Sequence, residues 1–258
     1  MSQLLKGKKG LILGVANKRS LAWSIAQAAS SEGAEIAFTY QGERLKEKVE
    51  TLTQELPGSL TMACDATSAT EIEAVMKQIE QAWGKLDFVV HAIAFAKAEE
   101  LSGEYLNVTE EGFLLAMNVS AYTLSSVTKA ARPLLRKSDN GGSVVTLTYL
   151  GGERVMPGYN VMGVAKSALD MSVRYLANDL GKENIRVNAI SAGPVNTLAA
   201  RGIRGFSEIL KIVRERAPLQ RNIEAAEVGK SALFLLSDMS SGVTGEILHV
   251  DAGFHITA

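Results

Sequence analysis

The sequence predicts an α/β fold in which one parallel sheet is covered by helices on both faces. Short apolar runs alternate with segments of helical periodicity along all 258 residues. The runs are apolar at almost every position, as strands of a parallel sheet buried on both faces require. No repeat, low-complexity tract or linker interrupts the alternation. We therefore expect a Rossmann-like, doubly wound sheet of seven parallel strands with right-handed crossovers, in a single domain over residues 1–258.

The expected elements follow one another in regular order. Strands are expected at 10–15, 35–40, 60–64, 86–92, 143–148, 185–191 and 246–250. Helical periodicity fills the intervals near 21–32, 43–55, 69–83, 109–135, 159–180, 206–216 and 226–236. Ligands of such sheets bind beyond the carboxyl ends of the strands. The functional residues should therefore lie in loops 14–20, 40–44, 64–67, 91–98, 148–158 and 191–206.

Composition excludes several classes of protein. The formal net charge of −1 gives no sign of the overall positive charge that binding to nucleic acid or to an anionic membrane surface favours. No apolar stretch approaches the roughly 20 residues of a membrane-spanning helix. The single cysteine, Cys64, excludes an intrachain disulfide and fits a reducing compartment, so we expect a cytoplasmic protein. The three histidines and the cysteine are too scattered to be metal ligands, and we interpret His91 as structural.

The first loop, in GVANKRSLAWSIA, has the position of a nucleotide-binding turn. Gly14 closes the first strand, and small or polar residues lead into a helix whose N-terminus can hold a pyrophosphate. The usual three-glycine fingerprint is absent. An ordinary strand-to-helix turn, with Ser20 as the helix N-cap, therefore stays open as an alternative.

The ends of the second and third strands bear on the choice of cofactor. Gln41 is neutral and can hydrogen-bond an adenosine, whereas Arg44 could attract a 2′-phosphate. NADH is preferred, and NADPH is the less favoured alternative. Asp65 can accept a hydrogen bond from an adenine amino group, or it can act as a cap or turn residue.

Two tyrosines and a lysine form the clearest catalytic pattern. Tyr149, Tyr159 and Lys166 lie in one short stretch. Positions 159 and 166 are seven apart, so on a helix they differ by only about 20° and share a face. The lysine can hold a ribose hydroxyl and favour the phenolate form of a tyrosine. That tyrosine can then stabilise an oxyanion or pass a proton to it.

The assembled motifs are similar to those of a known superfamily. The chain resembles the short-chain dehydrogenases/reductases in GVANKRSLAWSIA, FTYQ, CDA, HAIAFA, LTYLGGERVMPGYNVMGVAKSAL, RVNAISAGPVNTLAA and GEILHVDAGF. More narrowly, over about residues 5–256 it resembles the enoyl-acyl-carrier-protein reductases of bacterial and plastid type II fatty acid synthesis. Carbonyl-reducing members place the tyrosine four residues before the lysine. This chain has Met162 there, which cannot act as an acid.

The resemblance implies NADH-dependent reduction of the trans-2 double bond of an enoyl-acyl-carrier-protein thioester. Hydride goes to C3, Tyr159 stabilises the C1 oxygen, and Lys166 holds the nicotinamide ribose. Moving a tyrosine from four to seven residues before the lysine shifts it about 4.5 Å along the helix, in the sense needed to meet a displaced enolate oxygen. A carbonyl or 3-ketoacyl reductase of the same superfamily and a non-catalytic dinucleotide sensor stay open as alternatives.

The resemblance also implies which residues line the site. Cofactor contacts are expected at Gly14, Ser20, Leu21, Gln41, Asp65, Ala66, Ile93, Lys166, Val195, Asn196, Thr197, Leu198 and Ala199. Substrate contacts are expected at Ala96, Tyr149, Tyr159, Met162 and Phe206. Asn118 matches an asparagine that organises a relay water in the superfamily; a buried helix–helix hydrogen bond is the alternative. Ala94 stands where a glycine is usual, which bears on sensitivity to diphenyl-ether inhibitors.

A lid and a partner surface are expected near the C-terminal third. Residues 191–216 combine a glycine-punctuated loop with an apolar helix, as substrate-binding lids do. Segment 201–221 has an excess of basic residues, which predicts docking of the acidic acyl carrier protein; a solvated helix face is the alternative. The resemblance further implies a homotetramer, with helices 109–135 and 159–180 and strand 246–250 at its interfaces. It implies the cytoplasm, or the plastid stroma, as the location.

Overall fold

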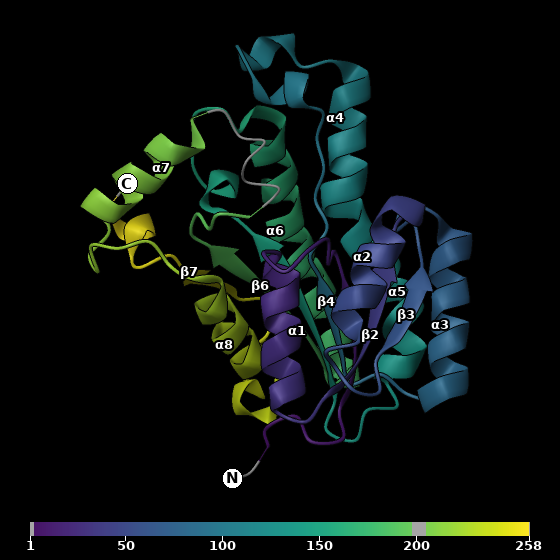
Figure 1. The fold of residues 1–258 in the computed structure, drawn as a ribbon. Helices are drawn as coiled ribbons and strands as arrows, with labels where there is room; N and C mark the ends of the chain where they lie inside the picture. Colours follow the sequence, from purple (N-terminus) through teal and green to yellow (C-terminus); the bar gives the residue numbers. More distant parts are fainter. Residues whose placement is uncertain (1–2, 198–204, 258) are drawn as a thin grey trace.

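A seven-stranded parallel sheet runs through the part of the chain that the computed structural model describes, residues 3–197 and 205–257 (Figure 1). Its strands are β1 (Lys9–Leu13), β2 (Glu35–Tyr40), β3 (Leu60–Ala63), β4 (Phe88–His91), β5 (Gly142–Thr148), β6 (Ile185–Ala192) and β7 (Ile247–Val250). Their order is β3-β2-β1-β4-β5-β6-β7, and every neighbouring pair is parallel. The predicted doubly wound sheet is confirmed.

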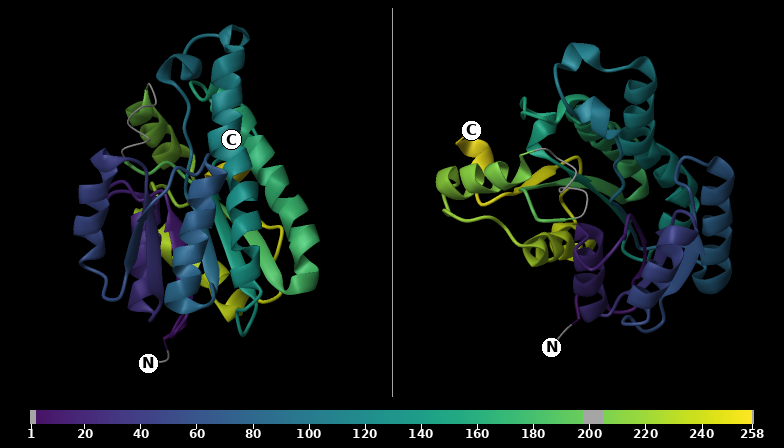
Figure 2. Two further views of the ribbon diagram at one scale, coloured as in Figure 1. Left: turned by 90° about the vertical axis from the view of Figure 1, so that its right-hand side faces the viewer. Right: turned by 45° about the horizontal axis from the view of Figure 1, so that its top comes forward.

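Helices cover both faces of this sheet. They are α1 (Leu21–Ser31), α2 (Glu43–Thr53), α3 (Ala69–Trp83), α4 (Glu110–Met117), α5 (Thr123–Leu135), α6 (Asn160–Leu180), α7 (Phe206–Arg216) and α8 (Ala225–Leu236). Helices α1, α2 and α8 share one hydrophobic core with the sheet, whereas α3, α5 and α6 share the other. In the left view of Figure 2, α2 and α6 accordingly lie at opposite sides of the molecule.

The two cores follow from strands that are apolar on both faces. Neighbouring residues point to opposite sides, so Ile12 and Val145 enter the core under α1 and α8, while Leu11 and Val144 enter the core under α5 and α6. All four side chains are fully buried. This burial is the physical reason that continuous apolar runs, rather than alternating ones, identified the strands.

The strand order creates a switch point beside β1. The chain runs from β1 outward through β2 and β3, and then returns to place β4 on the other side of β1. Ligands of doubly wound sheets bind in the crevice at the carboxyl ends of strands that diverge in this way. In Figure 1 this is the upper end of the sheet, where α4, α7 and the start of α6 also lie.

The helix expected over 109–135 is confirmed as an unbroken helical stretch, but it contains one irregularity that was not predicted. The stretch consists of α4, a π-helical turn over Asn118–Tyr122, and α5. The wider turn places Ser120 against the loop after β4, where its hydroxyl accepts from the Phe95 amide at 3.0 Å. It also lets the Thr123 hydroxyl reach His91. Single π-turns inside helices often mark functional sites.

Several short 3₁₀ turns were not expected. They cover Ala98–Leu101, Tyr105–Asn107, Leu150–Gly152, Gly181–Glu183, Asp238–Ser240 and Phe254–Ile256. Segments of three or four residues are too short to show a hydrophobic period, so the sequence carries no signal for them. In the described part of the chain, no helix is both long and apolar enough to cross a membrane.

Candidate active site

A glycine is required where β1 ends at the switch point. Gly14 has a φ of +98°, and a Cβ built there would lie 2.0 Å from the carbonyl oxygen of Ala92, just after β4. Only glycine allows the chain to leave β1 so close to its neighbouring strand. The fold therefore demands this glycine whether or not it also contacts a cofactor.

Ser20 folds the first loop rather than capping α1. It stands at the N-cap position, but its side chain makes no cap hydrogen bond. Instead its Oγ accepts from the amides of Ala16 and Asn17, both at 3.1 Å. The alternative of a side-chain cap is thus wrong, and the amides of Leu21 and Ala22 have no partner among the described residues. Unpaired amides at a helix N-terminus are suited to bind an anion.

The predicted adenosine-binding residues lie together at the ends of β2 and β3. The Gln41 amide donates to Oδ2 of Asp65 at 2.8 Å, and Thr67 donates to Oδ1 through its amide and its hydroxyl. Burial opposes the charged form, but these hydrogen bonds outweigh it and lower the pKa of Asp65. Asp65 is therefore an ionised acceptor, and the buried Ala66 follows it directly.

His91 is structural, as predicted. It is fully buried at the end of β4, and its two ring nitrogens pair with the hydroxyls of Thr146 and Thr123 at 3.0 and 2.9 Å. Burial, followed by the charge of Lys166, lowers its pKa to about 3. The imidazole is therefore neutral, and no carboxylate pairs with it among the described residues.

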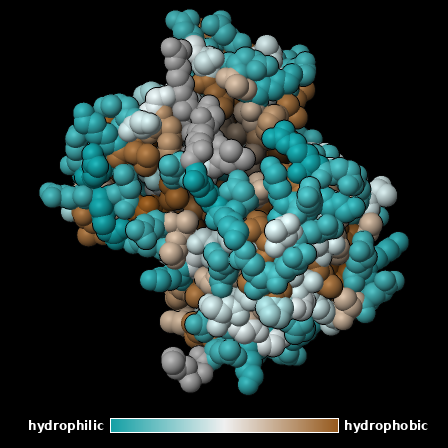
Figure 3. All heavy atoms as spheres, in the orientation of Figure 1, coloured by the Kyte–Doolittle hydropathy of each residue, from teal (hydrophilic) through white to brown (hydrophobic). Residues whose placement is uncertain are grey.

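The loop after β4 carries the predicted cofactor and substrate contacts Ile93 and Ala96, both partly buried, while Ala94 between them is exposed. Figure 3 shows that apolar residues gather at this upper end of the molecule, beside α7 and below α4. The Phe95 side chain in this loop is half exposed. The contacts themselves stay predictions.

Tyr149 and Tyr159 meet in the same part of the molecule. Tyr149 follows β5 and Tyr159 immediately precedes α6; their ring centroids are 5.0 Å apart in an edge-to-face arrangement. A Cβ at Gly151 would lie 2.5 Å from the Tyr159 ring, so the intervening glycine permits this packing. Tyr149 lies in the predicted loop 148–158 at the carboxyl edge of the sheet, and Tyr159, which was expected to begin the helix over 159–180, lies one residue before α6.

Lys166 lies two turns into α6 and is buried. Its Nζ donates to the carbonyl oxygen of Leu147 at 2.7 Å. Burial lowers its pKa to about 8, and the negative charge of Asp170 opposes this shift. Met162, which occupies the position of the tyrosine in carbonyl reductases, is also buried on α6.

The expectation that Lys166 favours a phenolate at Tyr159 was wrong for this structure. Burial, followed by the charges of Tyr149 and Asp170, raises the pKa of Tyr159 well above its usual range. Burial likewise raises the pKa of Tyr149 to about 12. Burial therefore keeps both tyrosines as neutral phenols, which can donate hydrogen bonds.

The remaining predicted contacts are placed only in part. Phe206 begins α7 and is partly buried, and Val195 packs against the core under α1 and α8. Thr197 donates its amide to Val195 at 2.7 Å, and Asn196 between them is exposed. Leu198 and Ala199 lie outside the described residues. The expected loop over 191–206 begins later, because β6 continues to Ala192.

Asn118 does not make the buried hydrogen bond that was weighed as an alternative. Its side chain is exposed at the start of the π-turn. Two residues near the tyrosines were not singled out from the sequence. Asp170 is a buried acid four positions after Lys166, a spacing that could have drawn attention to it. Asn160 has a φ of +36°, and the only signal for it is that asparagine tolerates this region.

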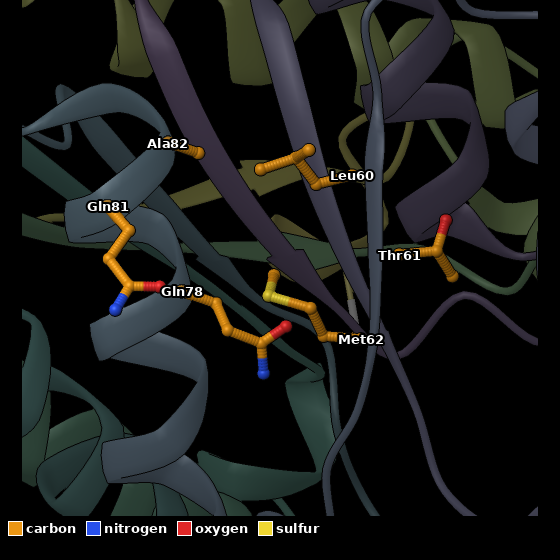
Figure 4. A pocket seen from close by; sticks show the side chains of 6 residues that line it. All are labelled: Leu60, Thr61, Met62, Gln78, Gln81 and Ala82. Carbon is orange, nitrogen blue, oxygen red and sulfur yellow. The ribbon is translucent and has the colours of Figure 1, made fainter.

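A hollow elsewhere on the surface contains none of these residues. It lies between β3 and α3 and is lined by Leu60, Thr61, Met62, Gln78, Gln81 and Ala82 (Figure 4). Because β3 is an edge strand, this hollow is the open margin of the sheet. Within residues 3–197 and 205–257, no group of three or more His, Cys, Asp or Glu side chains could hold a metal ion.

The fold and the site are those of a dinucleotide-dependent reductase: unpaired amides at a helix N-terminus at the switch point, an ionised acid after β3, two phenols in contact, and a buried lysine two turns into α6. The family model described as enoyl-(acyl carrier protein) reductase matches residues 14–255. The chain belongs to this family of oxidoreductases, and the resemblance expected from its motifs is confirmed.

Individual relatives agree with this membership. The enoyl-[acyl-carrier-protein] reductase [NADH] FabI of Bacillus subtilis is 56% identical over 100% of both chains. The Bacillus cereus enoyl-acyl carrier protein reductase, solved with NADP+ and indole naphthyridinone, is 50% identical with a TM-score of 0.96, covering 99% of each chain. The Anaplasma phagocytophilum enzyme, solved with NAD, is 49% identical with a TM-score of 0.94, covering 99% of this chain and 97% of its own.

Proposed function

We propose that this chain reduces the trans-2 double bond of enoyl-acyl-carrier-protein thioesters with NADH, and that Tyr159 stabilises the oxygen on which charge develops. Family membership supports the reaction. The observation that carries the residue assignment is the contact between two neutral phenols, Tyr149 and Tyr159, beside the buried Lys166.

The residues present fit a dinucleotide. The free amides of Leu21 and Ala22 can donate to the pyrophosphate, and Asp65 can accept from the adenosine. One N–H of Lys166 binds Leu147, which leaves two for ribose hydroxyls. When bound, NADH supplies the hydride that adds to C3 of the substrate.

An anion at the end of β3 supports NADH over NADPH. Asp65 is ionised, and it accepts from Gln41 at the end of β2. A 2′-phosphate in this region would meet that negative charge. Arg44 is exposed and forms no ion pair among the described residues, so it is the group that would oppose this preference. The ratio of kcat/KM for NADH to that for NADPH tests the proposal.

Side chains of the protein stabilise the charge that develops on the substrate in this proposal. Negative charge grows on the C1 oxygen of the thioester as hydride adds to C3. The neutral hydroxyl of Tyr159 donates a hydrogen bond to that oxygen, and the bond strengthens as the charge develops. Tyr149, Ala96, Met162 and Phe206 border the acyl chain in this proposal.

The test compares two substrates. The enzyme should consume NADH rapidly with a trans-2-enoyl thioester and not with a 3-ketoacyl thioester of the same length, because Met162 cannot protonate a carbonyl oxygen. Consumption with the ketoacyl thioester alone would replace the proposal with carbonyl reduction. Cofactor binding without turnover of either substrate would favour the dinucleotide sensor.

The basic face of α7 is proposed as the docking surface for acyl carrier protein. Lys211, Arg214 and Arg216 are exposed and form no ion pairs among the described residues. Arg221, by contrast, is paired with Glu227 through two hydrogen bonds of 2.8 and 2.7 Å. Its charge is therefore already neutralised.

Charge reversal tests this surface. Lys211→Glu with Arg214→Glu should lower turnover of the carrier-protein thioester more than turnover of a small thioester. Lys129→Glu reverses an exposed charge on α5 and serves as the matched control. Equal losses on both substrates would mean that α7 acts as part of a lid over 191–216 rather than as a docking surface.

A cytoplasmic homotetramer is also proposed. Exposed apolar side chains on the π-turn and α6, namely Tyr122, Met171 and Tyr175, support helix faces that pack against another copy. Sedimentation of Met171→Glu with Tyr175→Glu should show smaller species than the parent chain. An unchanged mass would place the interfaces elsewhere.

A further inference from the structure

Asp170 is a buried carboxylate one turn beyond Lys166 on α6. Each of these two residues is only 5% exposed. Four positions separate them, so their side chains emerge from the same face of the helix. An acid and a base are therefore buried side by side next to the tyrosine pair.

The loop after β5 packs closely against the side chains of Asp170 and Lys166. A Cβ built at Gly152 would lie 2.7 Å from Oδ2 of Asp170 and 3.1 Å from Cβ of Lys166. The missing side chain at 152 thus lets this loop, which begins with Tyr149, lie directly against the pair. Substitution of Gly152 would push the acid, the base or the loop away.

Hydrogen bonding does not account for the burial of Asp170. Its Oδ1 makes no hydrogen bond of normal geometry within the described residues, and neither does Oγ1 of Thr148 at the end of β5. Burying a carboxylate without such bonds is unfavourable unless a cation lies beside it. Asp170 has no ion pair within 4 Å among the described residues, and Lys166 donates to Leu147, so a cation acts on this carboxyl group only through space.

The groups facing Asp170 come from several elements. Burial, the largest effect, raises the pKa of Asp170, and Glu153 on the loop after β5 adds to this rise. The Thr148 hydroxyl, Lys166 and Arg174 lower it. Arg174 is exposed to solvent, so Lys166 is the cation that shares the buried environment.

The groups facing Lys166 are neutral apart from Asp170. Burial and the charge of Lys166 lower the pKa of His91 on β4, so His91 is itself uncharged, and Tyr159 is a neutral phenol. Among the described residues, no other carboxylate shifts the pKa of this lysine. Whether Lys166 keeps its proton in this buried site therefore depends on Asp170.

We propose that Asp170 is a positioning residue that holds Lys166 as a charged ammonium beside the tyrosine pair. This inference rests on the proposed role of Lys166 and adds the group that sustains it. Burial alone lowers the pKa of Lys166, and with Asp170 present the value is about 8. Without the carboxylate the pKa of the lysine would fall further, because burial would then act unopposed.

The experiment follows the protonation of Lys166 directly. Protein carrying ¹³C at lysine Cε is titrated by NMR, and the Lys166 signal is assigned from its absence in Lys166→Met. In Asp170→Asn, which keeps the shape and removes the charge, the titration midpoint should fall by about one pH unit, a tenfold loss in proton affinity. Asp170→Glu should restore most of it. Asp179→Asn, an exposed acid on the same helix, should leave it unchanged.

Turnover is measured in parallel so that the two proposals can fail separately. The alkaline limb of the pH profile for kcat/KM with NADH should move to lower pH in Asp170→Asn by the same amount as the NMR midpoint. A folded Asp170→Asn variant with the parental Lys166 midpoint would overturn the inference. A shifted midpoint with an unchanged pH profile would keep the pairing but contradict the role of Lys166.

A second measurement covers the case in which Asp170→Asn does not fold. In the parent protein, the Lys166 signal should show an additional inflection at the acidic pH where Asp170 becomes protonated, because the lysine then loses its charge partner. A single inflection would mean that Asp170 and Lys166 do not interact, and the inference would fall.

Discussion

The rings of Tyr149 and Tyr159 pack edge to face, with centroids 5.0 Å and planes 69° apart. One ring is supplied by the end of β5 and the other by the residue before α6. Through this contact, each ring restricts the orientation of the other. Their environments differ, because burial acts more strongly on Tyr159 and raises its pKa further.

Removing one hydroxyl at a time should separate the two tyrosines. Tyr159→Phe keeps the ring contact but removes the donor to the C1 oxygen, so kcat should fall by about 100-fold to 1,000-fold, typical of a lost oxyanion donor. Tyr149→Phe should have a smaller effect on kcat. Steady-state kinetics with NADH binding as the folding control would measure both. Equal losses would mean that the two phenols share the role.

Gly14 should tolerate no side chain. Gly14→Ala combines a positive φ with a 2.0 Å approach to the Ala92 carbonyl, so it should destabilise the fold by several kcal/mol and abolish NADH binding. Gly84→Ala is the matched control, since Gly84 is left-handed at the C-cap of α3, with a φ of +73° and nothing within 4 Å of an added Cβ. It should cost about 1 kcal/mol. Urea unfolding of both variants measures the difference; similar costs would show that the clash relaxes.

Backbone strain at Asn160 should matter to the orientation of Tyr159. Asn160 has a φ of +36° and donates its side-chain amide to the Gly103 carbonyl at 3.2 Å. Asn160→Gly should retain the backbone and most of kcat, whereas Asn160→Ala should lose roughly 1–2 kcal/mol of stability and part of kcat. If the alanine variant keeps full activity, the backbone at 160 does not control the tyrosine.

The protein should lose stability in acid through His91. The pKa of His91 is about 3 in the folded chain and 6.5 for a free side chain. Between these values the unfolded chain binds more protons, so stability is complete above about 6.5 and falls toward pH 3. The slope should approach 1.4 kcal/mol for each pH unit, roughly the energy of one pKa unit. Urea unfolding at pH 7 and pH 5 should show a smaller difference for His91→Gln than for the parent.

The sequence predicted the sheet well because the signal is physical and local. Strands buried on both faces must be continuously apolar, and Val89 and Val90 are one example, each entering a different core. The same logic placed Asp65 and Tyr149 correctly, since a residue just after a parallel strand must lie at its carboxyl edge.

Other features were beyond the reach of pattern alone. Helical periodicity tolerates one extra residue in a turn, so the π-turn over Asn118–Tyr122 left no visible break. The Ser20 hydroxyl accepts from loop amides rather than from helix amides. The two kinds of hydrogen bond have similar energies, so the sequence pattern does not predict which one forms. The neutral state of Tyr159 depends on burial by distant segments, which no local spacing reveals.

The π-turn has a further consequence for the geometry around the crevice. It delays the helix by one residue, and one residue corresponds to about 100° of rotation and 1.5 Å of rise. Deleting a single residue within Asn118–Tyr122 could therefore restore a regular helix and turn α4 by more than a quarter of a revolution relative to α5. The apolar side of α4 would then face a different direction over the strand ends. The direction in which α4 presents its side chains is thus set by the rotation of the helix at the π-turn. A conservative substitution leaves this rotation intact, and a one-residue deletion does not.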